Sequence, residues 1–416
     1  MSGPSALPPL ASVTKLSNYV TRILGQNPGK FTLQGTNTYL IHHPNSPSLI
    51  LLDTAQGFPS YLTHLGTALA AHPVQPCVLT DIILSHYHHD HTEGLSSVVT
   101  ELGRLGAVGP DGVRVWKFPC ARDAGVDERD RDGEVDARVR AIAATGLIDA
   151  RRDAGRDGEW FLVPGGQIRA LEDRQRFEIR GAPDVEGEGD GDDHSVELSV
   201  VHTPGHTTDS ISIELRARAK VDADDDASDP LGVFSFDTVL GHGTAVFSSL
   251  STYLASLTTL IALLSTRRAP PTAEDGGDAS DQGPPTEVPI YPGHGEVIRD
   301  GLAKVREYRH HRLERERQVV AALRSCGRAE PVTASSLTDS IYADTIPESL
   351  KLAATRGLLL HLDKLESDRV VSRHAPSEPG DGRGATRVDW ASLGIAEKDV
   401  PRGWDDRWRW ESGGQD

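Results

Sequence analysis

The segment LSHYHHDHTEGL, residues 84–95, concentrates four histidines and one aspartate within six positions. It follows CVLTDIIL, whose apolar and β-branched residues predict a buried strand, and it runs into EGLSSVVTELG, which predicts the start of a helix. In α/β folds, ligands and active sites lie outside the carboxyl ends of strands. The position of these histidines therefore indicates a functional site rather than a surface loop that happens to contain histidine.

The spacing HxHxDH within this segment fits metal ligation at two neighbouring points. His86 and His88 alternate at the end of a strand and can point to one side, whereas Asp90 and His91 turn toward a neighbouring point. Neutral imidazole suits Zn²⁺, and a carboxylate completes a site of borderline hardness. The segment thus predicts two metal sites, with His89 directed to solvent or to the surroundings of the ligands.

Three further candidate ligands follow in chain order. His202 ends the predicted strand SVELSVVHT within the motif HTPGHT, Asp237 ends the strand VFSFD, and His294 lies in IYPGHGE. Taken alone, a histidine beside Pro-Gly is most often a turn residue, and a strand-end aspartate is most often a helix cap. Together, at successive strand ends, they predict the residues that would complete both sites.

The rest of the first three hundred residues alternates between predicted strands and helices. Strands are expected at 31–41, 48–54, 78–85, 195–203, 209–215 and 232–238, and a helix near 59–71. The segment 248–266 predicts an amphipathic helix with one apolar face, formed by Leu250, Tyr253, Leu254, Leu257, Leu260, Ile261 and Leu264. Strands on either side of helices predict a layered α/β domain.

From about residue 299 the pattern becomes helical. Successive helices followed by the short strand RVVSRH have the order of a winged-helix-like module. We therefore predict a large α/β domain at 1–312, a winged-helix-like module at 313–375, and a polar, loosely ordered tail at 376–416 that contains Trp390, Trp404, Trp408 and Trp410. Gly/Asp/Pro-rich composition predicts solvated loop insertions near 121–160, 183–194, 218–230 and 268–288.

Charge and cysteine content narrow the classes of function. A formal net charge of −18 opposes general nucleic-acid binding, because phosphate contacts need a basic surface. Three widely spaced cysteines, Cys77, Cys120 and Cys326, fit a reducing compartment. The sequence has no run of about 18 apolar residues, and its N-terminal segment lacks the pattern of a signal or transit peptide. We therefore expect a cytoplasmic protein that does not enter a membrane.

The motifs HxHxDH, HTPGHT, the strand-end aspartate and YPGHG, in this order, resemble those of the metallo-β-lactamase superfamily of dinuclear hydrolases. The resemblance covers roughly residues 17–312 and implies a four-layer αβ/βα sandwich that binds two Zn²⁺ ions, with Mn²⁺ or Fe as alternatives. It implies that one metal is held by His86, His88 and His202, the other by Asp90, His91 and His294, and that Asp237 bridges them. FTLQGTNTYLI, LLDTAQG and LGHGTAVF further resemble the branch of fungal atrochrysone carboxyl ACP thioesterases and lactamase-β-like endoribonucleases.

Two departures from the family pattern lie beside the expected site. The family usually has glycine immediately before the bridging aspartate, but this chain has Phe236, whose side chain could crowd the metal bridge or require a different φ. The usual tryptophan of the first motif is Tyr87. Asp53, in LLDT, is a candidate acceptor for a ligand imidazole or else a turn-capping residue, and His206 is a candidate for similar support or for contact with substrate.

The first functional hypothesis is hydrolysis of a polyketide thioester carried by the acyl carrier protein domain of a polyketide synthase. Two metals would make hydroxide available at neutral pH, Asp90 would ligate and orient it, and a thiolate would leave without a strong general acid. Phe247 and Tyr253, just beyond Asp237, would help to line an aromatic substrate pocket, or else belong to the core.

Two alternatives remain open. An endoribonuclease would need a basic track, and residues 299–328 carry nine Arg or Lys against four Asp or Glu. Arg306, Arg309, Arg312 and Arg315 in this segment could instead dock an acidic carrier protein, or form a solvated helix face. A binding protein whose site has decayed around Phe236 is the third reading, which metal content would distinguish.

Overall fold

The computed structural model describes residues 7–109, 112–120, 122–123, 126–127, 168–181, 195–218, 228–265, 287–326, 331–342, 345–374 and 406–410. The predicted acidic insertions, Trp390 and Trp404 lie largely or wholly outside these ranges. The chain divides into two compact units, Met1–Phe247 with Ala255–Arg306, and Ser248–Leu254 with Glu307–Asp416.

The first unit contains a seven-stranded sheet in the order β1-β2-β3-β4-β5-β6-β9. Its strands are β1 (Val13–Lys15), β2 (Val20–Leu24), β3 (Asn37–His42), β4 (Ser48–Leu52), β5 (Val78–Leu84), β6 (Arg114–Lys117) and β9 (Arg169–Ala170). The pairs from β4 onward are parallel. Consequently the chain leaves β4 and β5 at the same edge of the sheet, where Asp53 and His86 follow.

A second, five-stranded sheet has the order β10-β11-β12-β13-β14. It consists of β10 (Arg176–Arg180), β11 (Ser195–His202), β12 (Ile211–Arg218), β13 (Ser228–Phe236) and β14 (Ile290–Pro292). β13 and β14 are parallel, so Asp237 and the residues after Pro292 also emerge at a common edge. Apolar residues of the two sheets form one buried core, which includes Tyr39, Ile41, Leu52, Ile83, Leu198, Val200, Phe234, Phe236 and Tyr291.

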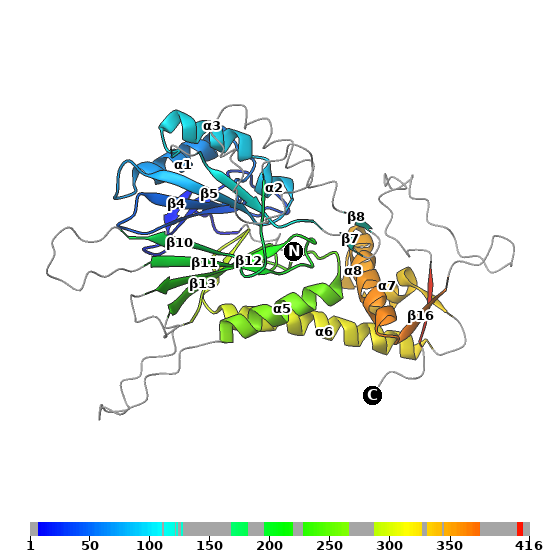
Figure 1. Ribbon diagram of the computed structural model, residues 1–416. Coiled ribbons are helices and arrows are strands. Elements are labelled where there is room, and N and C mark those ends of the chain that lie inside the picture. The colour runs from blue at the N-terminus through cyan, green and yellow to red at the C-terminus, as the bar shows by residue number, and fades with distance from the viewer. Residues whose placement is uncertain are drawn as a thin grey trace, which may run out of the picture. The chain divides into compact units, whose positions relative to one another are not determined.

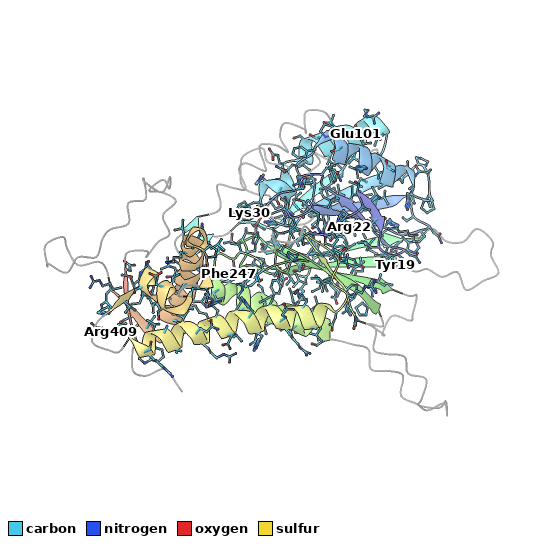
Figure 2. The ribbon with its side chains drawn as sticks, turned by 180° about the vertical axis from the view of Figure 1, so that it is seen from behind. Tyr19, Arg22, Lys30, Glu101, Phe247 and Arg409 are labelled. Carbon is cyan, nitrogen blue, oxygen red and sulfur yellow. The ribbon has the colours of Figure 1, made fainter. Side chains whose placement is uncertain are left out.

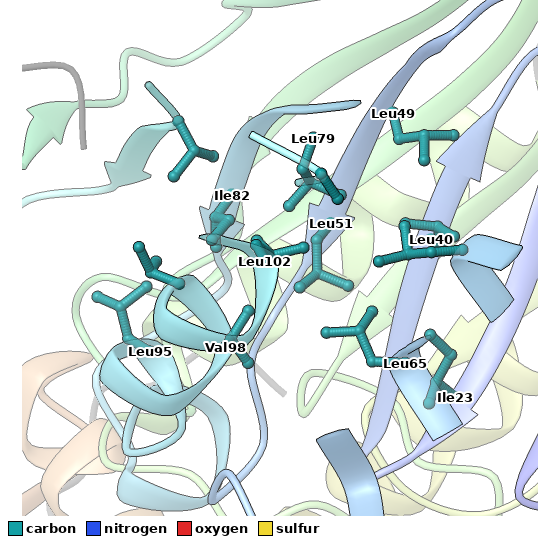
Figure 3. Close-up of a cluster of buried hydrophobic side chains, with 14 of the residues drawn as sticks. Ile23, Leu40, Leu49, Leu51, Leu65, Leu79, Ile82, Leu95, Val98 and Leu102 are labelled. Carbon is teal, nitrogen blue, oxygen red and sulfur yellow. The ribbon is translucent and has the colours of Figure 1, made fainter. Parts of the chain in front are cut away.

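Helices cover the outer faces of the two sheets (Figure 1). α1 (Pro59–Ala70) and α3 (Leu95–Leu105) pack against the seven-stranded sheet through a second core, in which Leu65, Val98 and Leu102 contact strand residues such as Leu51 and Leu79 (Figure 3). α5 (Leu250–Ser265) contributes its residues from Ala255 onward to the first unit, on the side of the five-stranded sheet (Figure 1). This is the layered αβ/βα arrangement expected from the sequence.

The second unit contains most of α6 (Gly301–Ser325), together with α7 (Ala334–Tyr342) and α8 (Glu348–Ser367). A three-stranded sheet, in the order β15-β17-β16, joins β15 (Val332–Thr333), β17 (Arg407–Trp410) and β16 (Val371–His374). Trp408 on β17 is fully buried in the core of this unit. Part of the expected polar tail therefore forms a strand, because its alternating RWRW pattern places one tryptophan against the helices.

Smaller differences concern the ends of elements. Residues 31–36 were expected to begin a strand but precede β3, and two short strands, Arg122–Asp123 and Val126–Asp127, form a two-stranded ribbon at the start of the first acidic insertion. In the described part of the chain, no helix is both long and apolar enough to cross a membrane.

Candidate metal centre

Strand ends bring the predicted histidines and aspartates to one place. His86 follows β5, and α2 (His89–Thr92) begins immediately after His88 and carries Asp90 and His91. Asp237 follows β13 and His294 follows β14, whereas His206 lies in the turn between β11 and β12. The side chains form two groups whose potential ligand atoms lie within 4.8 Å of one another: His86, His88, His206 and Asp237, and Asp90, His91 and His294.

In the first cluster, which consists of His86, His88, His206 and Asp237, ring nitrogens face one another at short range. His88 Nδ1 lies 2.9 Å from His86 Nε2 and 3.0 Å from His206 Nε2. Asp237 Oδ2 lies 3.6 Å from His206 Nε2 and 4.0 Å from His86 Nε2. Three nitrogens and a carboxylate oxygen thus converge, which is the donor set that zinc prefers.

In the second cluster, which consists of Asp90, His91 and His294, two imidazoles approach a carboxylate. Asp90 Oδ2 lies 3.2 Å from His294 Nε2 and 3.5 Å from His91 Nε2. Asp237 joins the two clusters, because its Oδ1 lies 3.4 Å from His91 Nε2 and its Oδ2 lies 3.4 Å from His294 Nε2. The geometry places the carboxylate of Asp237 near ring nitrogens of both groups.

The far nitrogens of three of these rings are held by neighbouring groups. His91 Nδ1 lies 2.7 Å from Asp53 Oδ2, and His206 Nδ1 lies 2.7 Å from the carbonyl oxygen of Val246. His86 Nδ1 lies 3.0 Å from Ser85 Oγ, which itself donates to Asp53 Oδ2. Such contacts fix the orientation of a ring and leave its other nitrogen directed to the cluster, as in known metal sites. Asp53 therefore lies where the sequence suggested, in contact with a candidate ligand.

Electrostatics differ between the clusters. Burial, together with the neighbouring His206, lowers the pKa of His88 to about 4, so this imidazole is neutral near pH 7. Burial alone would lower the pKa of His294, but the carboxylates of Asp237 and Asp90 outweigh it and raise this pKa to about 9. Burial would likewise raise the pKa of Asp237, yet the adjacent His294 and His91 hold it well below its usual range. The second cluster therefore stabilises positive charge.

The residues present fit a pair of metal ions. His91 Nε2 and Asp237 Oδ1 are buried and have no hydrogen-bond partner among the described residues, although each is a strong polar group. Buried polar atoms normally have partners, and exceptions call for an explanation. A cation held in the second cluster would give both atoms a partner, and a second cation would do the same for the converging nitrogens of the first cluster.

The predicted role of His202 must be corrected. His202 ends β11, but its ring stacks on Phe118, with centroids 3.9 Å apart, and its Nε2 lies 2.9 Å from the carbonyl oxygen of Thr208. The chain then turns through Gly205, whose φ of +133° favours glycine, and delivers His206 to the first cluster. His206, the second histidine of HTPGHT, thus takes the place expected for His202.

Phe236 adopts the unusual backbone that the missing glycine suggested, with φ at +45°. Its ring does not reach either cluster but is buried in the core between the sheets, where it stacks with Phe234. Crowding at this edge is relieved by Gly293, since a Cβ there would lie 2.2 Å from Asp237 Oδ1. The sequence contained this signal in YPGHG, but only the structure shows which neighbour requires the first glycine.

We expect Phe236→Gly to destabilise the protein. Loss of the buried ring should cost about 3–5 kcal/mol, and relief of the left-handed backbone should return about 1 kcal/mol. The net decrease in the free energy of unfolding should therefore be about 2–4 kcal/mol, measured by denaturant titration. Phe236→Ala is the matched control, because it removes the ring and retains the strain, and it should be less stable than the glycine variant. Equal stability of the two variants would contradict backbone strain.

Two residues expected to line a substrate pocket are buried. Tyr253 is fully buried, and the guanidinium of Arg312 lies 5.8 Å from its ring centroid within the second unit, so Tyr253 belongs to the core. Phe247 is buried in the segment between β13 and α5 (Figure 2). Its neighbour Val246 is 65 % exposed and supplies the carbonyl that holds His206. His89 is exposed, as expected.

Comparison with known proteins agrees with this fold. The model of the β-lactamase associated winged helix domain matches residues 333–378. The chain is 30 % identical over 373 residues to the beta-lactamase-like protein 2 homolog of Drosophila melanogaster, covering 89 % of this chain and 96 % of the relative. It is 29 % identical over 374 residues to an atrochrysone carboxyl ACP thioesterase of Aspergillus chevalieri, covering 88 % and 87 %. A β-lactamase domain protein from Burkholderia ambifaria superposes with a TM-score of 0.53 and 16 % identity, covering 98 % of this chain and 96 % of that one.

The fold and the histidine–aspartate clusters define a protein of the metallo-β-lactamase class with a C-terminal winged helix domain. Within this class, the chain belongs to the family of β-lactamase-like proteins, a family of metallo-β-lactamase-like hydrolases.

Proposed function

We propose that the protein is a dinuclear zinc hydrolase that cleaves an acyl thioester, releasing a polyketide acid from an acyl carrier protein. The main support for a metal centre is the position of the Asp237 carboxylate, whose two oxygens lie 3.4–4.0 Å from ring nitrogens of both clusters. The thioester preference is supported by the thioesterase among the relatives.

His86, His88 and His206 would hold one ion, and Asp90, His91 and His294 the other, with Asp237 shared. Two zinc ions bound there would lower the pKa of a water and polarise the substrate carbonyl. The imidazole-rich donor set favours zinc over Mn²⁺, whereas Fe accepts the same ligands, so elemental analysis of the purified protein decides between zinc and Fe.

The chain's own residues have separable roles in this proposal. Asp90 orients the attacking water, and Thr36, whose hydroxyl lies 3.5 Å from Asp90 Oδ2, restrains that carboxylate. Asp53 holds the His91 ring in one orientation. A thiolate leaving group, with a pKa near about 8.5, departs without a strong general acid. The site therefore needs no additional proton donor for a thioester.

Parallel assays test the proposal. The zinc-loaded protein is incubated in separate reactions with an aromatic acyl thioester and with a single-stranded RNA, each with and without a chelator. We expect thioester hydrolysis that the chelator abolishes and added zinc restores, with the RNA intact. RNA cleavage without thioester hydrolysis would favour the endoribonuclease instead. Failure of the wild type to bind zinc would leave the non-catalytic binding protein as the better hypothesis.

The carrier protein is proposed to dock on the basic part of α6. The four arginines do not form one exposed patch as expected, because Arg312 lies against Tyr253 and the guanidinium of Arg315 lies 4.6 Å from the Tyr342 ring centroid. Arg306 is exposed and Arg309 is half-buried, so these two are the candidates for docking.

A cytoplasmic location belongs to the same proposal and is supported by the three cysteines, which form no disulfide with one another.

We expect Arg306→Glu/Arg309→Glu to raise the apparent KM for carrier-bound substrate about tenfold, because charge complementarity mainly assists encounter. Hydrolysis of a small free thioester should be unchanged, and the salt dependence of the carrier reaction should weaken. Arg104→Glu, at an exposed arginine of α3, is the matched control. An equal loss with both substrates would show that these arginines serve the fold.

A further inference from the structure

Lys117 and Asp209 form a buried ion pair. Asp209 lies three positions after His206, a member of the first cluster. Lys117 Nζ lies 2.7 Å from Asp209 Oδ2, and both side chains are 0 % exposed. Lys117 ends β6 of the seven-stranded sheet, and Asp209 lies in the turn that leads to β12 of the five-stranded sheet. The pair therefore links the two sheets at the turn that carries His206.

Both partners use their remaining polar atoms. Lys117 Nζ also donates to the carbonyl oxygen of Phe118 at 2.9 Å and lies 3.3 Å from Cys120 Sγ. Asp209 Oδ1 accepts a hydrogen bond of 2.7 Å from Thr207 Oγ1, the residue after His206. The Lys117 ammonium thus contacts the Asp209 carboxylate, which accepts a hydrogen bond from the hydroxyl of Thr207. Thr207 directly follows the candidate ligand His206.

The same turn is also held by Ser256, by Val246 and by the contact of His202 Nε2 with the Thr208 carbonyl. Ser256 Oγ donates to the carbonyl oxygen of Pro204 at 2.6 Å, and the Val246 carbonyl lies 2.7 Å from His206 Nδ1. Gly205, at the start of the turn, has φ at +133°, a backbone conformation that favours glycine. On the side of Thr207 the turn is held by Ser210, whose Oγ accepts a hydrogen bond of 3.1 Å from the Thr207 backbone N–H and lies 2.6 Å from Thr207 Oγ1, and by Asp209. Asp209 is the partner that ties this side of the turn to the seven-stranded sheet, through Lys117.

We propose that the Lys117–Asp209 pair is a positioning device that fixes the His206 imidazole for metal binding at the first cluster. The proposal rests on the metal centre proposed above. A buried ion pair often adds little net stability compared with apolar residues of the same size. An apolar pair, however, cannot accept the hydrogen bond from Thr207, so stability and positioning are separable by mutation.

The discriminating variant is Lys117→Met/Asp209→Leu, which removes both charges together. We expect its metal-free form to melt near the wild-type temperature, whereas Lys117→Met alone melts far lower because it leaves a buried carboxylate unpaired. In chelator competition, the double variant should bind one zinc ion about 10–100-fold more weakly and the other with unchanged affinity. His206→Ala identifies which affinity belongs to the first cluster. Arg114→Met, which removes the ion pair between Arg114 on β6, the strand of Lys117, and Asp81 on the adjacent strand β5, should change neither affinity.

A measurement without metal separates this proposal from the proposed function. Imidazole ¹⁵N spectra of the metal-free wild type should show His206 in a single tautomer with its proton on Nδ1, as the contact with the Val246 carbonyl requires. The double variant should show a tautomer mixture. Wild type that binds no zinc would refute the metal centre, yet leave this comparison as a test of the pair. A double variant with wild-type tautomer and zinc affinities would overturn the positioning role.

Discussion

Replacing His206 with alanine should remove one of the two proposed metal ions and lower the proposed thioester hydrolysis about 10³-fold, because the first cluster loses one of its three imidazoles. His206 Nε2 lies 3.0 Å from His88 Nδ1 and 3.6 Å from Asp237 Oδ2, so its loss leaves His86, His88 and Asp237 as the members of this cluster. Zinc per chain, measured by elemental analysis after removal of loosely bound metal, should fall from two toward one.

His202→Ala is the matched control, since both histidines belong to the motif HTPGHT and lie four positions apart. This variant loses the stacking on Phe118 and the contact with the Thr208 carbonyl, but it keeps every member of the first cluster. We expect its zinc content to equal that of the wild type and its turnover to fall much less. If His202→Ala lost metal and His206→Ala kept it, the geometry described for the first cluster would be refuted.

The sequence could not decide which histidine of HTPGHT, His202 or His206, joins the first cluster. Strand periodicity located the end of β11 at His202, and a strand-end histidine was the natural candidate ligand. The position of the candidate ligand depends on where the chain reverses after the strand, and this turn contains Gly205 and contacts Lys117 and Val246 from other elements. Such contacts join residues distant in sequence, so periodicity does not show them.

The residues at the other strand ends were predictable, because each follows its strand directly. His86 follows β5, Asp237 follows β13, and the parallel pairing of β13 with β14 brings His294 to the same edge. The motif pattern therefore placed six of the seven expected cluster members, all except His202. Asp53 was also predictable as a neighbour, because β4 and β5 are adjacent and parallel.

Features that depend on non-local pairing were missed. The strand Arg407–Trp410 lies far from its partners Val371–His374 in sequence, so a short polar segment gave little sign that it would complete a sheet. The alternation of arginine and tryptophan was visible in the sequence, but nothing in it indicated that Trp408 would pack against the helices of the second unit. The backbone of Phe236 was anticipated as unusual, whereas the burial of its ring between the sheets was not.

Replacement of Asp237 with alanine should have the largest effect of any single change at the centre. Asp237 is the one side chain that approaches ring nitrogens of both clusters, among the residues assigned to them here. Its loss removes negative charge that raises the pKa of His294 to about 9, so the second cluster loses much of its attraction for a cation. We expect zinc content well below one ion per chain and hydrolysis reduced by more than about 10³-fold.

Asp237→Asn distinguishes charge from shape, because the amide has the same size and keeps one carbonyl oxygen. It should retain more zinc than Asp237→Ala but less than the wild type, since one oxygen can still contact one cluster. Asp173→Ala, which removes an exposed carboxylate that accepts a hydrogen bond from the backbone of His202, is the control and should leave both zinc ions bound. Full zinc occupancy and turnover in Asp237→Ala would mean that the two clusters act independently, and the dinuclear mechanism would have to be abandoned.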